Sequence, residues 1–197
     1  MKLASFIFKT ALLAVLVISG TTLIGFSDSV AATLSDDEAA DLTFQREEEK
    51  LARDVYLALY DQWGAAIFSN IAASEQKHMD TLKKMLDQYK LPDPALPAKG
   101  DFTNEYLQFK YDELVATGLV SYEDGLYVGA TIEEIDMIDI QKALDGTKRL
   151  DLRTAYQNLL EGSNNHLRAF VAGLAAQGII YTPQFINQEF YDAIIGL

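Results

Sequence analysis

The segment SEQKHMDTL, residues 74–82, places a glutamate and a histidine three positions apart within a pattern typical of a buried helix. At about 100° per residue, Glu75 and His78 lie at the centre of the apolar face of that helix. A folded chain tolerates a buried carboxylate when the charge is paired or bound to a metal. A glutamate and a histidine at this spacing can reach one metal ion from a regular helix. They are therefore candidate metal ligands, with a hydrogen-bonded core pair as the alternative.

Further carboxylates occur in REEEKLARDVYLALY, residues 46–60. Helical spacing places Glu48 at the centre of the apolar face and Glu49 at its edge, beside Ala52 and Tyr56. Three consecutive glutamates usually form a solvated face, but this pattern allows at most one or two of them to point outward. One ligand is therefore expected from this segment, and the spacing alone leaves open whether it is Glu49 or Glu48.

A third set of acids lies in TIEEIDMIDIQKAL, residues 131–144. Glu133 and Asp136 form an i, i+3 carboxylate pair that faces inward with the apolar residues. Asp139 lies on the same face, and its role is left open. Glu134 falls on the other side of the helix and is the alternative to Glu133 as a ligand. The competing interpretation is that these acids form ion pairs with the cations Arg53, Lys142 or Arg149.

The segment YQNLLEGSNNHLRAFV, residues 156–171, contains the second histidine of the chain. His166 lies on the flank of its apolar face. Glu161 lies about 140° from His166 and points to solvent if the helix is regular. Only a π-type insertion would bring Glu161 and His166 together, so a regular helix contributes His166 alone.

Four long segments with helical periodicity would position these residues, at 36–63, 66–90, 121–144 and 151–178. Gly64 ends the first, and three prolines after Lys90 end the second. Ser121 and Asp124 predict a capping box for the third, and Asp151 predicts an N-cap for the fourth. Strand-type alternation is scarce. The expected fold class is all-α, an antiparallel four-helix bundle, with a long connection between the second and third helices that holds a short helix.

Residues 1–31 resemble a secretory signal peptide, because Lys2 and Lys9 precede a long apolar run that small residues follow. An uncleaved membrane anchor is the alternative. The mature domain would then span residues 32–197 and function in the periplasm or outside the cell.

The composition excludes several classes of function. The 197-residue chain has a net charge of -13. Without the first 31 residues it keeps 14 basic against 28 acidic residues, a net charge of -14. Such a surface repels phosphate backbones, so nucleic acid is not an expected partner. Cysteine is absent, which excludes disulfides, thiolate chemistry, a lipid anchor and a rubredoxin-like site, so any electron donor must be external.

These motifs together resemble the ferritin-like diiron-carboxylate proteins, in which two helices each give a glutamate and two give Glu-x-x-His pairs. The resemblance is specific at EKLARDVY, which begins at Glu49, and at EQKH, which holds Glu75 and His78. It is looser at EEID, which is similar to the E-x-x-E of the rubrerythrin branch, and it departs at Ser163, where a glutamate is expected. REEEKLARDVYLALY, SEQKHMDTLKKML and GSNNHLRAF are similar to a prokaryotic ferritin-like family of unassigned function.

The resemblance implies a site for two iron ions, with manganese or another divalent metal as an alternative. The implied metal ligands are Glu49, Glu75, His78, Glu133, Asp136 and His166. Glu75 would bridge the two ions, His78 would cap one of them, and Tyr56 would be a redox neighbour. The expected activity is that of a ferroxidase or peroxidase acting on ferrous iron, oxygen or peroxide. The alternatives are a protein that sequesters metal and a purely structural bundle, and a homodimer is left open.

Overall fold

The computed structural model describes residues 33–196, which form six helices and no strand. The all-α prediction is therefore confirmed over this part of the chain. The expected signal peptide at residues 1–31 lies outside the described residues and stays a prediction. None of the described helices combines the length and the apolar character that crossing a membrane requires.

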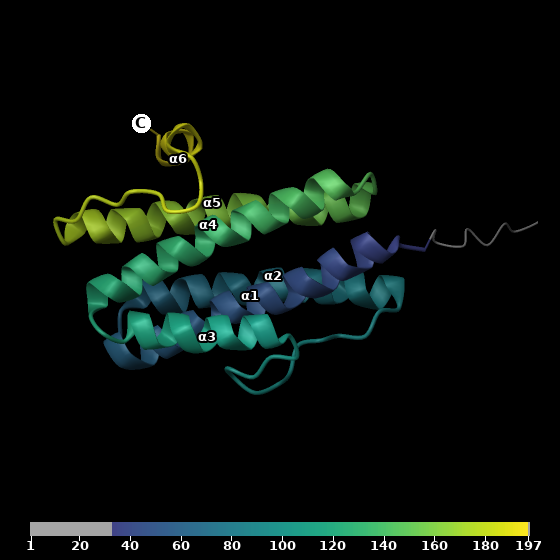
Figure 1. Ribbon diagram of the computed structural model, residues 1–197, viewed down its shortest axis with the longest axis horizontal. Helices are drawn as coiled ribbons and strands as arrows, with labels where there is room; N and C mark the ends of the chain where they lie inside the picture. Colours follow the sequence, from purple (N-terminus) through teal and green to yellow (C-terminus); the bar gives the residue numbers. More distant parts are fainter. Residues whose placement is uncertain (1–32, 197) are drawn as a thin grey trace, which may run out of the picture. The chain divides into compact units, whose positions relative to one another are not determined.

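The four long helices pack as two antiparallel pairs, α1 with α2 and α4 with α5 (Figure 1). The two pairs lie side by side, and α3 packs against both α1 and α4. The connection that contains α3 joins the end of α2 to the start of α4, as expected. The helix bounds are α1 Asp36–Trp63, α2 Ala66–Tyr89, α3 Glu105–Gly118, α4 Tyr122–Gly146, α5 Leu150–Ala176 and α6 Gln188–Ile195.

Side-chain caps and left-handed residues account for most helix ends. Ser35 caps α1 in a reciprocal box with Glu38, and Gly64 ends the helix at φ 62°. The hydroxyl of Ser121 accepts a hydrogen bond from the backbone N–H of Asp124 at the start of α4. Lys90 follows α2 in the left-handed region, at φ 58°. These ends agree with the expected boundaries to within two residues.

The expected N-cap of the fourth long helix is wrong. The helix α5 begins at Leu150 after Arg149, which provides no side-chain cap. Asp151 lies inside the first turn, and its carboxylate accepts a hydrogen bond of 2.5 Å from the hydroxyl of Tyr89. The helix also ends at Ala176, two residues before Gly178. The carboxylate of Asp151 therefore bonds to Tyr89 at the end of α2 and does not cap α5 as the sequence pattern predicted.

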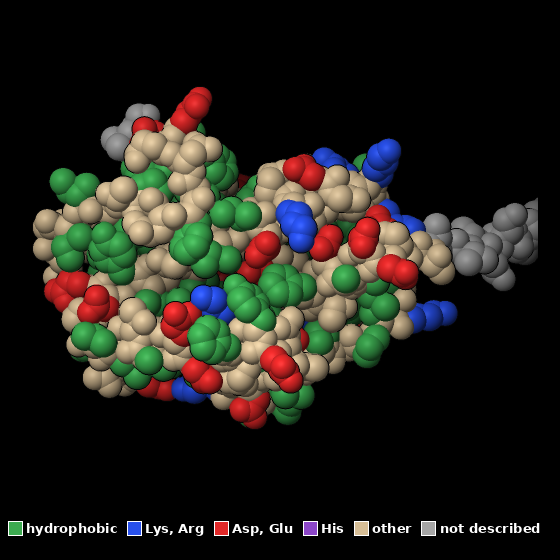
Figure 2. All heavy atoms as spheres, in the orientation of Figure 1, with side chains coloured by type: hydrophobic (Ala, Val, Ile, Leu, Met, Phe, Trp, Pro, Cys, Tyr) green, Lys and Arg blue, Asp and Glu red, His purple; other side chains and the backbone are tan. Residues whose placement is uncertain are grey.

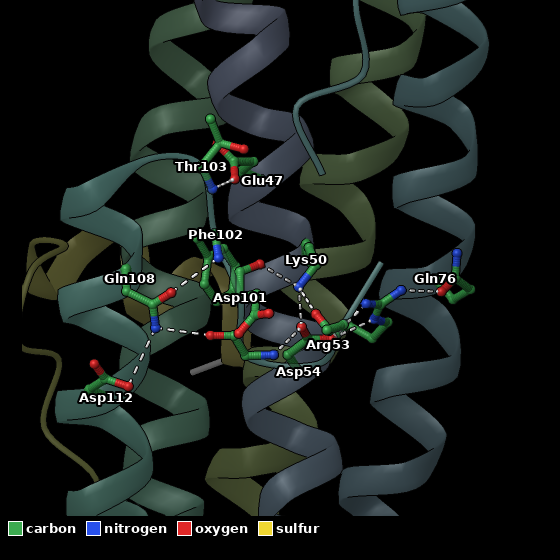
Figure 3. A network of polar contacts seen from close by, with 12 residues as sticks. Glu47, Lys50, Arg53, Asp54, Gln76, Asp101, Phe102, Thr103, Gln108 and Asp112 are labelled. Carbon is green, nitrogen blue, oxygen red and sulfur yellow. Dashed lines mark hydrogen bonds and ion pairs between the residues drawn. The ribbon is translucent and has the colours of Figure 1, made fainter. Parts of the chain in front are cut away.

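Polar groups on the outer side of α1 hold the long connection in place (Figure 3). The fully buried Lys50 pairs with Asp54 at 2.5 Å and donates to the backbone carbonyls of Ala98 and Asp101. Glu47 accepts hydrogen bonds from two backbone N–H groups of the same connection. Arg46 pairs with Asp93 of the same connection, so three of the five charged residues in the REEEK run hold this connection and only Glu48 and Glu49 do not.

The apolar core is divided into two clusters, and each of the four long helices contributes residues to both. On α2, Ile71 belongs to one cluster and Leu82 to the other; on α5, Leu167 and Leu159 are divided in the same way. Buried polar side chains lie on these helices near the change from one cluster to the other: Glu48, Glu49, Glu75, Glu133, Asp136, Ser163 and His166. The fold therefore surrounds one polar layer with apolar packing on both sides.

Candidate metal centre

The first group of candidate ligands joins α1 to α2. One ligand atom from each of Glu49, Glu75 and His78 lies within 4.8 Å of the other two. Nδ1 of His78 lies 2.7 Å from Oε2 of Glu75 and 3.1 Å from Oε2 of Glu49. Both carboxylates are at most 2% exposed. The helical spacing of Glu75 and His78 therefore brings both side chains to one point opposite α1, as the sequence predicted.

The second group joins α2 to α4 and α5. Ligand atoms of Glu75, Glu133 and His166 again lie within 4.8 Å of one another. Nδ1 of His166 lies 2.7 Å from Oε1 of Glu75 and 3.4 Å from Oε2 of Glu133. Glu75 thus belongs to both groups, and it turns one oxygen to each imidazole. The centroids of the rings of His78 and His166 are 5.6 Å apart. One carboxylate thus lies between two imidazoles.

The donor set fits metal ions, because several of its atoms are buried and have no hydrogen-bond partner. These atoms include Oε1 of Glu49, Oε1 of Glu75 and Nδ1 of His166. The last two atoms are 2.7 Å apart. Leaving such groups unsatisfied is costly, whereas a cation between them would accept their lone pairs. Carboxylate oxygen combined with imidazole nitrogen suits iron and manganese.

The charges in the polar layer shift the pKa values of its members strongly. Burial raises the pKa of Glu49 to about 8, because the attraction of His78 does not outweigh desolvation and the charge of Glu75. Burial would also raise the pKa of Glu75, but the two imidazoles beside it lower its pKa to about 2. Burial disfavours charged imidazoles, yet the carboxylates raise the pKa of His78 to about 11 and that of His166 to about 10. The layer therefore attracts positive charge despite its burial.

Asp136 is the one expected ligand that the structure does not bring into either group. Its carboxylate accepts a hydrogen bond of 2.6 Å from the hydroxyl of Ser163, and its other oxygen is buried without a partner. Burial, together with the charges of Glu49 and Glu48, raises its pKa well above the usual value. Asp136 therefore lies beside the two groups, in contact with the serine that stands where the resemblance expects a glutamate.

The alternative glutamates on α1 and α4 lie outside the two groups. Glu48 is buried on another side of α1, where it accepts a hydrogen bond from Gln45 and lies beside Asp139. Glu134 is fully buried, but its carboxylate accepts hydrogen bonds from Tyr181 and from the backbone N–H groups of residues 184–186. Neither glutamate replaces its neighbour in the two groups. The sequence pattern missed Glu134 as the anchor of the C-terminal segment, because its partners are mostly backbone atoms about 50 residues away.

The expected geometry of the fourth long helix is confirmed. The helix α5 is regular from Leu150 to Ala176, so Glu161 is exposed while His166 is buried. Two of the three cations that were expected to pair with the inward-facing acids have other partners in the described residues. Arg53 pairs with Asp54, and Arg149 pairs with Glu38.

Two further residues contact the candidate ligands. The hydroxyl of Tyr56, a residue that the motif had placed nearby, donates a hydrogen bond of 2.5 Å to Glu133. Gly162 on α5 allows His78 to approach closely, because a Cβ there would lie 2.5 Å from Cε1 and Nε2 of that ring. Sequence reasoning missed Gly162. A glycine within a helix costs about 1 kcal/mol relative to alanine, and such a position often marks a close approach of this kind.

Comparison with known proteins supports a shared fold and a shared family. Residues 38–196, which include all five grouped ligands, match the family described as an uncharacterized protein domain, DUF2202. "Uncharacterized protein MJ0754" of Methanocaldococcus jannaschii is 48% identical over 164 residues, which cover 83% of this chain and 89% of that protein. The crystal structure of hypothetical protein MJ0754 from Methanococcus jannaschii superposes with a TM-score of 0.82 at 47% identity, covering 83% of this chain and 94% of that one. The chain therefore belongs to the DUF2202 family.

Proposed function

We propose that this protein is an exported, ferritin-like four-helix bundle that binds two metal ions, most simply iron, and acts on ferrous iron with oxygen or peroxide. The observation that carries the proposal is the position of Glu75, which turns one carboxylate oxygen toward each of two imidazoles. A purely structural ion pair needs only one of these contacts. A carboxylate shared by two three-residue groups matches a bridged pair of cations.

The two halves of the proposed centre have equivalent donor sets. Glu49 and His78 would hold one ion, Glu133 and His166 would hold the other, and Glu75 would bridge them. Three carboxylates would offset most of the charge of two divalent cations. Ligand nitrogens must be free of protons, so metal uptake would displace a proton from each imidazole nitrogen that binds an ion.

A bound iron pair would supply electrons to oxygen or peroxide, and the residues of the chain would shape the setting in which that occurs. The apolar clusters on both sides of the layer limit the access of water. Tyr56 fixes the orientation of Glu133 through their hydrogen bond, a role typical of residues that orient metal ligands. The five grouped ligands would leave coordination positions open on both ions for small reactants.

A second candidate function is metal sequestration without turnover. Two observations favour metal sequestration. The ligands are buried, and the chain has no cysteine that could bind an electron-transfer metal site. Oxygen consumption on adding ferrous iron separates the two functions. Uptake of iron that consumes oxygen supports the oxidase, and uptake without consumption supports sequestration.

The metal-binding proposal itself is tested by anaerobic titration with ferrous iron. The wild-type protein should bind two ions per chain, and Glu75→Ala should bind none tightly because both groups lose their shared carboxylate. Glu161→Ala is the matched control, since it removes an exposed glutamate from the same bundle and should leave two ions bound. Two ions in Glu75→Ala, or none in the wild type, would contradict the proposal.

A further inference from the structure

A pocket of about 390 Å³ opens between α1, α3, α4 and the C-terminal segment, on the side of α1 away from the candidate metal centre. Small-molecule sites usually have volumes of about 300 to 1,000 Å³. Figure 2 shows hydrophobic side chains gathered on this face of the molecule, over α3 and toward the C-terminal segment. The apolar lining includes Leu51, Leu107, Leu114, Val128 and Ile132.

One buried polar side chain lies among these apolar walls. Glu48 lines the pocket although it is only 5% exposed. One of its oxygens accepts a hydrogen bond of 2.9 Å from Nε2 of Gln45, and Asp139 lies beside the carboxyl group, which has capacity for further bonds. The other charged residues of the lining are Lys110 and Glu113 on α3 and Asp124 on α4, and all three are partly or largely exposed. The pocket thus combines an apolar body with a single buried hydrogen-bonding point.

We propose that this pocket binds a small, mainly apolar molecule that carries a hydroxyl group, and that the hydroxyl pairs with Glu48. A hydroxyl both donates and accepts hydrogen bonds, so it matches a carboxyl group in either protonation state. The acidic character of the chain disfavours an anionic ligand, and the apolar walls disfavour a highly polar one. An apolar molecule without a hydrogen-bonding group would leave the carboxyl of Glu48 poorly solvated.

The inference does not rest on the proposed metal function. Glu48 faces the pocket while its neighbour Glu49 faces the first group of ligands. Ile132 and Glu133 divide in the same way on α4. The contact between α1 and α4 therefore separates the pocket from the candidate metal centre, and the ligand would bind beside the centre whether or not metal is present.

Equilibrium dialysis with 2-naphthol and naphthalene tests the role of Glu48, because the two probes differ by one hydroxyl. The wild-type protein should bind one 2-naphthol per chain, about two- to ten-fold more tightly than naphthalene, the range expected for one net hydrogen bond. Glu48→Leu should remove this preference, and Glu48→Gln should retain most of it. A preference that survives in Glu48→Leu, or an equal affinity for the two probes in the wild type, would overturn the assignment.

The location of the site is tested by filling the pocket. Thr131 lines it and is only half-buried, so Thr131→Trp should fold and should weaken 2-naphthol binding at least ten-fold. The matched control is Val171→Trp, which fills a second pocket of about 570 Å³ beside the C-terminal segment and should leave binding unchanged. Binding that is lost in Val171→Trp but kept in Thr131→Trp would overturn the proposal, as would the absence of saturable binding in the folded wild type.

Discussion

Gly162→Ala should remove one metal ion from the proposed centre although it replaces none of the ligands. The added Cβ would lie 2.5 Å from Cε1 and Nε2 of His78, whereas ordinary contacts of a Cβ lie at 3.4–4 Å. The ring must therefore retreat by about 1 Å, given the normal separation of non-bonded carbon atoms. Distances between metal and ligand tolerate changes of only about 0.2 Å. His78 would thus lose contact with an ion held by Glu49 and Glu75, while the group that contains His166 would remain.

The same substitution should have a small effect on the stability of the metal-free protein. Alanine is favoured over glycine within a helix by about 1 kcal/mol, and crowding against His78 costs about 1–3 kcal/mol. The expected net loss in the free energy of unfolding is therefore about 0–2 kcal/mol. Chemical denaturation in the presence of chelator measures this loss, and elemental analysis measures metal per chain, which should fall from two to one.

Gly173→Ala is the matched control for this experiment, because it makes the same change on the same helix. A Cβ there would lie 3.2 Å from Cδ2 of Leu126, a flexible side chain in the apolar core. This variant should keep two metal ions per chain. Two ions bound with wild-type affinity in Gly162→Ala, or an equal loss in Gly173→Ala, would refute the claim that Gly162 positions His78.

Three further predictions concern groups around the centre. Tyr56→Phe should weaken metal binding about ten-fold in competition with a chelator, because Glu133 loses the group that orients it. Glu134→Ala should lower the free energy of unfolding by about 2–4 kcal/mol, since charged hydrogen bonds are lost, and chymotrypsin should then cut at Phe185. Burial would raise the pKa of Asp93, but the hydrogen bonds from Arg46 lower it. The pair of Arg46 and Asp93 therefore stabilises the fold at pH values above the usual pKa of aspartate. This stabilisation is lost as the pH falls through the lowered pKa of Asp93. Asp93→Asn should therefore cost about 1 kcal/mol at pH 7 and progressively less as pH falls below the usual aspartate pKa in denaturation experiments, and a cost that does not change with pH would contradict this.

The long helices could be predicted from the sequence because their ends are marked locally. Gly64 and Ser121 mark ends or starts through backbone conformation and side-chain capping, which depend on adjacent residues alone. Glu75 and His78 could be predicted as neighbours for the same reason, since their approach follows from the spacing within one helix. Local geometry likewise places Glu161 in solvent.

The remaining assignments depended on contacts between distant segments. Helical spacing placed Glu49 at the edge of one apolar face, but α1 packs against α2, α3 and α4 and buries Glu48 and Glu49 on different sides. Asp151 left its expected capping role because Tyr89 lies within hydrogen-bond distance. Glu134 binds a backbone segment for which the sequence contains no periodic signal. A helix packed on several sides therefore defeats an argument based on a single buried face.

Anomalous X-ray diffraction from crystals of protein purified from its own cells decides whether two metal ions share Glu75. Data collected on both sides of the iron absorption edge identify the element and its position together. We expect two anomalous peaks, one beside Glu49 and His78 and the other beside Glu133 and His166, both within bonding distance of the carboxylate of Glu75. A single peak away from Glu75, or crystals of folded protein with no metal peak in this layer, would show that Glu75 does not bridge two ions.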